Sequence, residues 1–284
     1  MARTDMPIEG TEATDALCRE ISKKSNGVVF LGFSGGKDSL CAYLNLRRFF
    51  KRIIPFHCAA WPGVRHIREY LDYVEYETGG VHILRMNGED YPMAASRMMY
   101  QPFKDCVEIE NWDVPTYSKL DVLEFLRYRY ALPKAWCAFG IAACESIDRA
   151  IYVKKIEGRN PQNRTFYPCY DWSRKQILDT VEQSGIKLPS SYRYVNRTIG
   201  HVPGIVTNEI LKRHYPEDWK RVLALYPLAE AKTYREQILD REWLRRRNEV
   251  IVANGGEASA EGPSTDEDTE LYEGDWMEDT GAEG

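Results

Sequence analysis

An uninterrupted apolar run followed by a glycine-rich turn constrains the fold of this chain more than any other feature. The run Val28–Phe33 leads into the turn Ser34–Ser39, and a helical pattern extends from about Asp38 to Phe50. A short, wholly apolar segment is typical of a strand that is buried on both faces, as in a parallel sheet. The order strand, turn, helix therefore predicts an α/β protein.

The same order recurs immediately downstream. Ile53–His57 reads as a second strand, Val64–Glu77 as a helix and Val81–Leu84 as a third strand. Alternating strands and helices predict a doubly wound, mainly parallel sheet with right-handed crossovers. This is the fold class expected for the chain, with a helical C-terminal extension and a disordered acidic tail.

Other elements are predicted from periodicity and capping residues. In the first helix, Ala13, Leu17 and Ile21 share a face with Cys18. Either Asp171 or Ser173 would cap the helix that ends at Gly185. The predicted helices are Thr11–Lys24, Ser118–Arg129, the segment ending at Ser184, Glu209–Arg213, Glu217–Leu225 and Leu228–Val252. A further strand is predicted at Ala150–Ile156, and Tyr91–Pro115 receives no assignment.

Charge and composition divide the chain into four predicted regions. Of the 43 Asp and Glu residues, many lie beyond residue 253, where no Lys or Arg occurs, so the remainder of the chain is mildly basic. That remainder suits a polyphosphate ligand, and the acidic segment reads as a solvated tail. The expected regions are an N-terminal helix (1–26), a nucleotide-binding domain (27–205), a helical region (206–252) and the tail (253–284).

The seven cysteines indicate a reducing compartment. They are odd in number and contain no CxxC pair, so neither a disulfide framework nor a zinc site is expected. Cys137, which follows Trp136, is either a buried structural thiol or a redox thiol. The chain shows no signal-peptide pattern and no membrane-spanning stretch, which favours a cytoplasmic protein without a membrane partner.

The turn after the first strand has the composition of an anion site. Its two glycines allow a tight turn and a close ligand approach, and the first amides of the following helix point outward unpaired. A lysine and two hydroxyls add donors, and an aspartate can hold Mg²⁺. The residues are Ser34, Gly35, Gly36, Lys37, Asp38 and Ser39. The turn matches neither the Walker A loop nor the Rossmann fingerprint.

The hexapeptide Ser34–Ser39 after a buried strand resembles the PP-loop of the ATP pyrophosphatase superfamily, the adenine nucleotide α-hydrolases. The resemblance implies ATP and Mg²⁺ as ligands and cleavage between the α and β phosphates. It also implies that the loop grips the phosphates, that Lys37 stabilises transition-state charge and that Asp38 contacts the metal. Lys37 and Asp38 are therefore the candidate catalytic residues.

Within that superfamily the chain looks most like the phosphoadenylylsulfate (PAPS) reductase family. Three segments carry this resemblance beyond the loop. They are Phe139–Arg149, similar to G-x-R-x-x-E-S-x-x-R; Tyr167–Ser173, similar to Y-P-x-x-D-W-S/T; and Gly185–Tyr192, similar to G-I-x-x-x-P-x-Y. Family position assigns Arg149 to the nucleotide site, whereas its spacing from Glu145 also allows a simple helical ion pair.

Departures from that family decide the predicted ligand. The chain lacks the Glu-Cys-Gly-x-His segment of true reductases, and it lacks the paired cysteines that hold iron–sulfur clusters in related reductases. Ala142 replaces the usual arginine, which removes a cation from a site for a phosphosulfate. We therefore expect ATP as ligand, with neither an iron–sulfur cluster nor zinc, as in cysteine-poor relatives from mobile elements or type IV CRISPR systems.

Residues outside the loop complete the candidate site. His57 and Cys58 end the second strand, where ligands of open sheets bind, so they either flank the adenine or ribose or simply pack. Asp171 and Trp172 are either a cap and a core aromatic or a catalytic pair. Arg245–Arg247 form a solvated helix face, a docking site for the acidic tail or a contact for nucleic acid.

Three functions remain open at this level. The first is an enzyme that cleaves Mg-ATP to AMP and pyrophosphate, with water or an unidentified nucleophile as acceptor, in nucleic-acid modification or a CRISPR-associated setting. The second is a sulfonucleotide reductase that uses a thiol such as Cys137. The third is a non-catalytic nucleotide-binding accessory protein of a nucleoprotein complex. The sequence sets neither the acceptor nor the oligomeric state.

Overall fold

The computed structural model describes residues 8–59, 63–87, 101–111, 117–195, 198–199, 205–231, 234–235, 238–239 and 241. They form two compact units. The first contains the described residues of Met1–Glu89 and Pro115–Thr198, and the second those of Asp90–Val114 and Ile199–Tyr272. The predicted acidic tail, the Arg245–Arg247 run and most of Tyr91–Pro115 lie outside the described residues.

The first unit is built on a six-stranded sheet with the order β3-β2-β1-β4-β6-β5. Its strands are β1 (Val28–Gly32), β2 (Arg52–Ala59), β3 (Leu84–Asn87), β4 (Trp136–Phe139), β5 (Arg159–Asn160) and β6 (Thr165–Phe166). Every pairing is parallel except that of β5 with β6. The predicted α/β fold with a mainly parallel sheet is thus confirmed.

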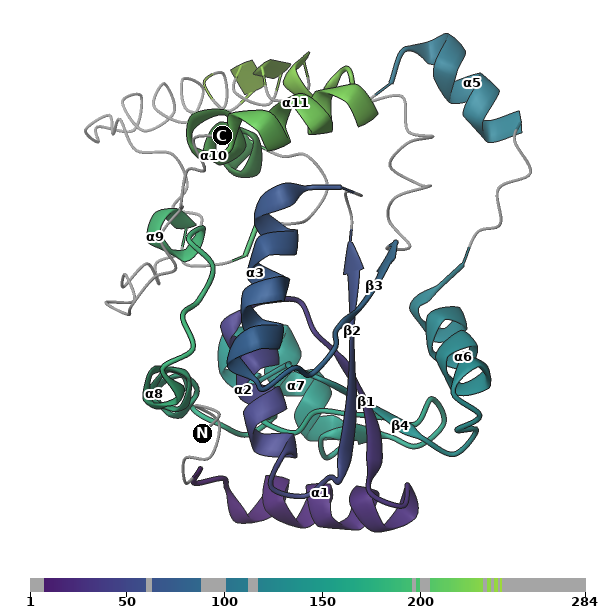
Figure 1. Cartoon of the computed structure of the whole chain (residues 1–284), viewed down its shortest axis with the longest axis vertical. Helices are drawn as coiled ribbons and strands as arrows, with labels where there is room; N and C mark the ends of the chain where they lie inside the picture. The colour runs from purple at the N-terminus through teal and green to yellow at the C-terminus, as the bar shows by residue number, and fades with distance from the viewer. Residues whose placement is uncertain are drawn as a thin grey trace, which may run out of the picture. The chain divides into compact units, whose positions relative to one another are not determined.

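Helices cover both sides of this sheet, as Figure 1 shows: α2 and α3 lie to one side of the strands and α6 to the other. On the α6 side, Phe30 of β1 and Cys137 of β4 pack with Leu126 in one buried cluster. The helices of the unit are α1 (Glu12–Lys24), α2 (Lys37–Leu46), α3 (Arg65–Glu77), α6 (Lys119–Arg129), α7 (Ile147–Lys155), α8 (Arg174–Ser184) and α9 (Tyr192–Val195), with the 3₁₀ turn η1 (Ala143–Glu145).

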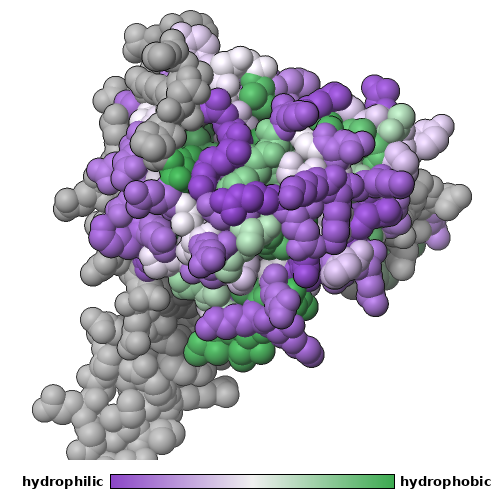
Figure 2. Space-filling model, turned by 90° about the horizontal axis from the view of Figure 1, so that it is seen from below, coloured by the Kyte–Doolittle hydropathy of each residue, from purple (hydrophilic) through white to green (hydrophobic). Residues whose placement is uncertain are grey.

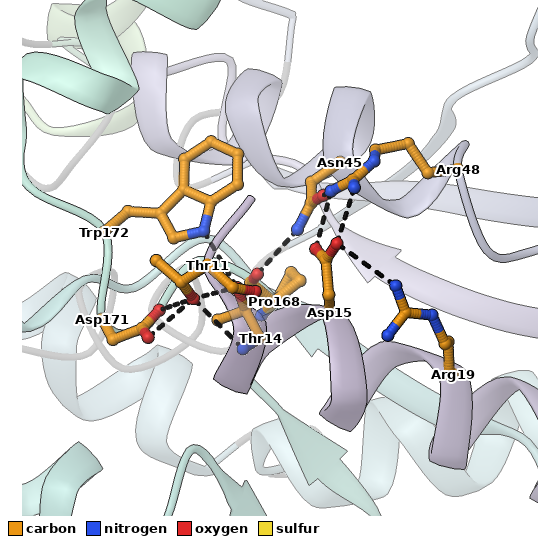
Figure 3. Close-up of polar contacts among 9 residues, drawn as sticks. All are labelled: Thr11, Thr14, Asp15, Arg19, Asn45, Arg48, Pro168, Asp171 and Trp172. Atoms are coloured by element: carbon orange, nitrogen blue, oxygen red, sulfur yellow. Dashed lines mark hydrogen bonds and ion pairs between the residues drawn. The ribbon is translucent and has the colours of Figure 1, made fainter. Parts of the chain in front are cut away.

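Polar contacts attach α1 to the rest of the first unit (Figure 3). Thr11, the N-cap of α1, donates to both carboxylate oxygens of Asp171 at 2.7 and 2.8 Å. The buried indole of Trp172 donates to Thr14 Oγ1 at 3.0 Å. Ser173 is the N-cap of α8 in a capping box, so of the two predicted caps it is Ser173 that caps the helix. Asp171 and Trp172 therefore act as structural anchors.

A second set of contacts in Figure 3 ties α1 to the turn after α2, and α2 to the segment after β6. Arg48 donates to both carboxylate oxygens of Asp15 at 2.7 and 2.6 Å, and Asn45 Nδ2 donates to the carbonyl oxygen of Pro168 at 2.8 Å. Both contacts bring together segments remote in sequence.

Seen from the end of Figure 1 where α1 lies, the described surface is mostly hydrophilic (Figure 2).

The second unit is helical among its described residues. It contains α5 (Phe103–Asn111), α10 (Ile205–His214) and α11 (Pro216–Leu225). Trp219 of α11 is buried, and the ammonium group of Lys212 lies 5.2 Å from its ring centroid. The predicted helices at 209–213 and 217–225 fall within α10 and α11.

Some element predictions were wrong. The predicted strand Ala150–Ile156 lies in α7, which Ser146 caps and in which only Val153 is buried. A strand would place Ile151 and Val153 on one face, but in the helix Val153 is buried and Ile151 is exposed. The third strand starts at Leu84 instead of ending there, and Ala13 is exposed whereas Thr14 is buried.

Candidate active site

The candidate site lies where the order of the sheet reverses. From β1 the chain proceeds to β2 and β3 on one side of the sheet and later reaches β4 on the other side of β1. Ligands of open α/β sheets bind beyond the strand ends at such a switch point. Here the glycine loop Ser34–Ser39 follows β1, and Gly140–Ala142 follows β4.

The glycine loop is shaped by its own hydroxyls. Gly35 has a φ of +82°, which favours glycine, and the Gly36 N–H donates to Ser34 Oγ at 3.3 Å. Ser39 Oγ donates to the Gly36 carbonyl oxygen at 2.9 Å, and Ser34 Oγ donates to Ser39 Oγ at 3.1 Å. Both serine hydroxyls therefore hold the loop in shape.

The segment after β4 comes directly against the loop. A Cβ atom on Gly140 would lie 2.4 Å from the carbonyl oxygen of Asp38, which backbone atoms do not tolerate. Only glycine therefore allows the two segments to approach so closely. This approach places η1, with Glu145, beside the first turn of α2.

Four charged side chains meet at this junction. Lys37 Nζ lies 2.7 Å from Asp38 Oδ2 and 3.6 Å from Glu145 Oε1. Arg149 of α7 pairs with the other carboxylate oxygen of Glu145; the predicted ion pair is present, but Glu145 lies in η1 and not in the same helix. The side chains of Lys37, Asp38 and Glu145 are each less than a fifth exposed. Both cations thus have acidic partners within the protein.

The carboxyl group of Asp38 is buried beside charged groups, and its pKa is raised. Burial raises the pKa of Asp38 to about 6; the Lys37 ammonium opposes this effect and the Glu145 carboxylate adds to it. Its Oδ1 atom is buried and has no hydrogen-bond partner among the described residues. This atom can therefore accept a ligand proton or contact a divalent cation without giving up an existing bond.

Two tyrosines, which the sequence analysis did not assign to the site, bracket the loop. Tyr192 Oη accepts a hydrogen bond from the backbone N–H of Lys37 at 2.9 Å. The ring of Tyr70 from α3 lies 3.3 Å from the position that a Cβ atom on Gly35 would take. Tyr192 was quoted only as the last residue of a family motif, and Tyr70 lies in a helix whose pattern signals nothing but amphipathicity.

His57 and Cys58 differ sharply in their surroundings. His57 Nδ1 lies 2.9 Å from the carbonyl oxygen of Phe33, just before the loop, and burial lowers the pKa of the imidazole. The neutral ring therefore donates from Nδ1, and its buried Nε2 has no hydrogen-bond partner among the residues described. Cys58, the next residue in β2, is exposed.

The cysteines give little support for thiol chemistry. Cys137 is completely buried in β4, and burial raises the pKa of its thiol well above the usual value. A redox thiol needs exposure and a stabilised thiolate, so Cys137 does not suit that role. Cys144 is the exposed thiol of η1, but burial, followed by the charges of Asp38 and Glu145, raises its pKa as well.

Comparison with known proteins gives limited information. No protein-family model matches the chain, and no curated protein matches it. Among solved structures, the chain is similar to the U34-tRNA thiolase NcsA from Methanococcus maripaludis with its [4Fe-4S] cluster. The two share 17% identity with a TM-score of 0.39, over 77% of this chain and 80% of the other.

One prediction about cofactors needs correction. The sequence analysis expected no iron–sulfur cluster, but a solved structure that this chain resembles contains a [4Fe-4S] cluster, so that expectation is withdrawn. Among the described residues, no group of three or more His, Cys, Asp and Glu side chains is arranged to hold a metal ion.

No described helix has the length and apolar character needed to cross a membrane.

Proposed function

We propose that this chain is a PP-loop ATP pyrophosphatase that binds ATP at the glycine loop and cleaves the bond between its α and β phosphates. Water or another nucleophile attacks the α phosphorus, and pyrophosphate leaves. With water the products are AMP and pyrophosphate. With another nucleophile, AMP is transferred to the acceptor.

The observation that carries this proposal is the joint position of Lys37, Asp38 and the N-terminus of α2 at the switch point of the sheet. The helix terminus offers N–H groups and the positive end of a dipole, and the lysine adds a full charge. These groups suit a polyphosphate, and Lys37 would stabilise charge that develops on the leaving pyrophosphate.

The remaining roles follow from position. Asp38 would contact the divalent cation that accompanies the nucleotide, because its Oδ1 is buried and lacks a hydrogen-bond partner among the described residues. Arg149 is half exposed and would turn from Glu145 to a phosphate. Cys58, which is exposed at the end of β2, would flank the adenine or ribose, whereas His57 would support the loop through its hydrogen bond to the Phe33 carbonyl oxygen.

The test is product analysis with ATP labelled at the α phosphate, in buffer with Mg²⁺. Chromatography should show labelled AMP, or a labelled AMP adduct when the acceptor is present, with pyrophosphate in equal amount. Labelled ADP as the only product would contradict α–β cleavage. Binding without any turnover would favour the alternative of a non-catalytic accessory protein.

Paired lysine variants identify the site. Lys37→Ala should abolish turnover, whereas Lys175→Ala removes an exposed lysine of α8 that pairs with Asp179 and should leave turnover intact. Thermal unfolding of both variants would verify that they fold. Equal activity of Lys37→Ala and the unaltered protein would exclude the glycine loop as the catalytic site.

The acceptor and its setting belong to this proposal. We propose an acceptor in nucleic-acid modification, in a mobile-element or CRISPR-associated setting, from the resemblance of the sequence to such relatives. Incubation with labelled ATP and total RNA, single-stranded DNA or no acceptor would separate these cases. Label that remains with the nucleic acid and is released by nuclease would identify the acceptor class.

A further inference from the structure

The first amide of α2, which a phosphate would be expected to contact, already has an internal partner. Tyr192 Oη accepts the hydrogen bond of the Lys37 backbone N–H at 2.9 Å, although the two residues lie 155 positions apart in the sequence. The same oxygen lies 3.1 Å from the position that a Cβ atom on Gly36 would take. The tyrosine is 3% exposed, so its hydroxyl is firmly placed against the loop.

A phenol and a phosphate cannot both take this position. The N–H groups of the first helical turn have no partner within the helix, and they are the groups with which a helix terminus binds an anion. The oxygen of a neutral phenol is a weaker acceptor than that of a charged phosphate, since charge-assisted hydrogen bonds are about twice as strong. A phosphate oxygen that binds this amide must therefore displace the hydroxyl.

Other atoms around the loop also lack the partners that a ligand would supply. Tyr70 is 3% exposed with its ring against Gly35, and its hydroxyl has no hydrogen-bond partner among the described residues. Asp38 follows Lys37 in the loop, and its Oδ1 atom is also buried without a hydrogen-bond partner among the described residues. Buried polar atoms are rarely left in this state, so the loop is suited to a state that contains further polar groups.

We propose that the Tyr192 hydroxyl is an internal placeholder for a phosphate oxygen on the Lys37 amide, and that nucleotide binding displaces it. This inference rests on the proposed function and adds a subsite to it. Tyr192 then acts as a positioning residue: it keeps the loop in shape before the ligand arrives, and its displacement lowers the observed affinity. The ligand recognised at this subsite is a phosphate group of a nucleotide or of pyrophosphate.

The test measures the sign of an affinity change. Tyr192→Phe keeps the ring but removes the hydroxyl, so calorimetric titration with pyrophosphate, and separately with Mg-ATP, should show binding about fivefold tighter than in the unaltered protein, as loss of one competing hydrogen bond implies. A hydroxyl that binds the ligand, or one that only supports the fold, would give weaker or equal binding. Either of those results would overturn the inference.

Tyr73→Phe is the matched control. Tyr73 Oη accepts the backbone N–H of Lys187 at 3.0 Å, so this variant loses the same kind of hydrogen bond at a backbone amide outside Ser34–Ser39, although its ring packs with that of Tyr70. Its affinity for pyrophosphate should equal that of the unaltered protein. A similar tightening in Tyr73→Phe would show that loss of any such bond loosens the unit, and it would overturn the placeholder role.

The outcomes separate the two proposals. If the unaltered protein binds neither ligand, the proposed function falls and this subsite with it. If it binds both but Tyr192→Phe does not bind more tightly, only the subsite falls. Should Tyr192→Phe fail to fold, the full chain with 3-fluorotyrosine at position 192 provides the measurement: pyrophosphate should shift its fluorine resonance, and an unchanged resonance at saturation would refute displacement.

Discussion

Lys37 Nζ lies 3.6 Å from Glu145 Oε1, which joins the loop after β1 to the turn after β4. Glu145 also pairs with Arg149, so one carboxylate compensates two cations of the candidate site. Under the proposed function, a polyphosphate would compete with Glu145 for both cations. We therefore expect its affinity to depend on how strongly Glu145 holds them.

Glu145→Gln should tighten the binding of pyrophosphate. The change frees Lys37 and Arg149 from a largely buried carboxylate, and we expect binding about fivefold tighter, corresponding to about 1 kcal/mol of charge interaction. This gain in affinity should decrease at high salt, because dissolved ions screen the charges in the exposed part of the site. Glu182→Gln, an exposed residue of α8, removes the same charge elsewhere and should change binding little. Equal effects of both variants would show that the change in net charge, and not the position of Glu145, accounts for the result.

Asp38→Asn should stabilise the fold at neutral pH. Because burial raises the pKa of Asp38 from 3.8 to about 6, the folded protein binds this proton more tightly than the unfolded chain does. The ionised carboxylate therefore lowers the free energy of unfolding above pH 6, by at most about 3 kcal/mol. This cost decreases as the pH falls from 6 to below 3.8.

Urea unfolding at pH 7.5 and pH 4 measures this dependence on pH. Asp38→Asn should be more stable than the unaltered protein at pH 7.5, and the difference should be nearly absent at pH 4. Asp148→Asn, in the exposed first turn of α7, is the control and should give no such gain. A stability difference that is independent of pH would contradict the raised pKa.

Thr14→Val should destabilise the first unit by about 1 to 3 kcal/mol, because the buried indole N–H of Trp172 loses its acceptor. Thr14→Ser retains the hydroxyl and should cost less. The free energy of unfolding from urea titration, followed by tryptophan fluorescence, distinguishes the two variants. If valine and serine were equally tolerated, the hydrogen bond between α1 and the turn before α8 would contribute nothing measurable.

Thiol labelling should divide the cysteines into two classes. Cys58 and Cys144 are exposed, and the other five are buried, among them Cys18, for which burial raises the pKa of the thiol to about 12. A disulfide reagent at pH 8 should therefore modify two thiols in the native protein and all seven after denaturation. Rapid native labelling of Cys137 would contradict its burial and revive the reductase hypothesis.

Local sequence signals were sufficient wherever one segment determines its own structure. The apolar run before Ser34 predicted the central strand, Ser118 and Gly185 marked helix boundaries, and the glycine loop was placed at the end of β1. Prediction failed at 150–156, where apolar residues expected in a strand belong to the helix α7. It also missed β4, since four residues are too few to show a periodicity.

The sequence by itself determined an α/β sheet and an anion-binding turn, because strand burial, glycine conformations and helix capping are local properties of short segments. Only the tertiary structure decided what surrounds Lys37. Glu145 and Tyr192 reach it from segments distant in sequence, through the parallel pairing of β1 with β4 and the path of the chain after α8. Such partners depend on strand order and packing, which no local pattern encodes.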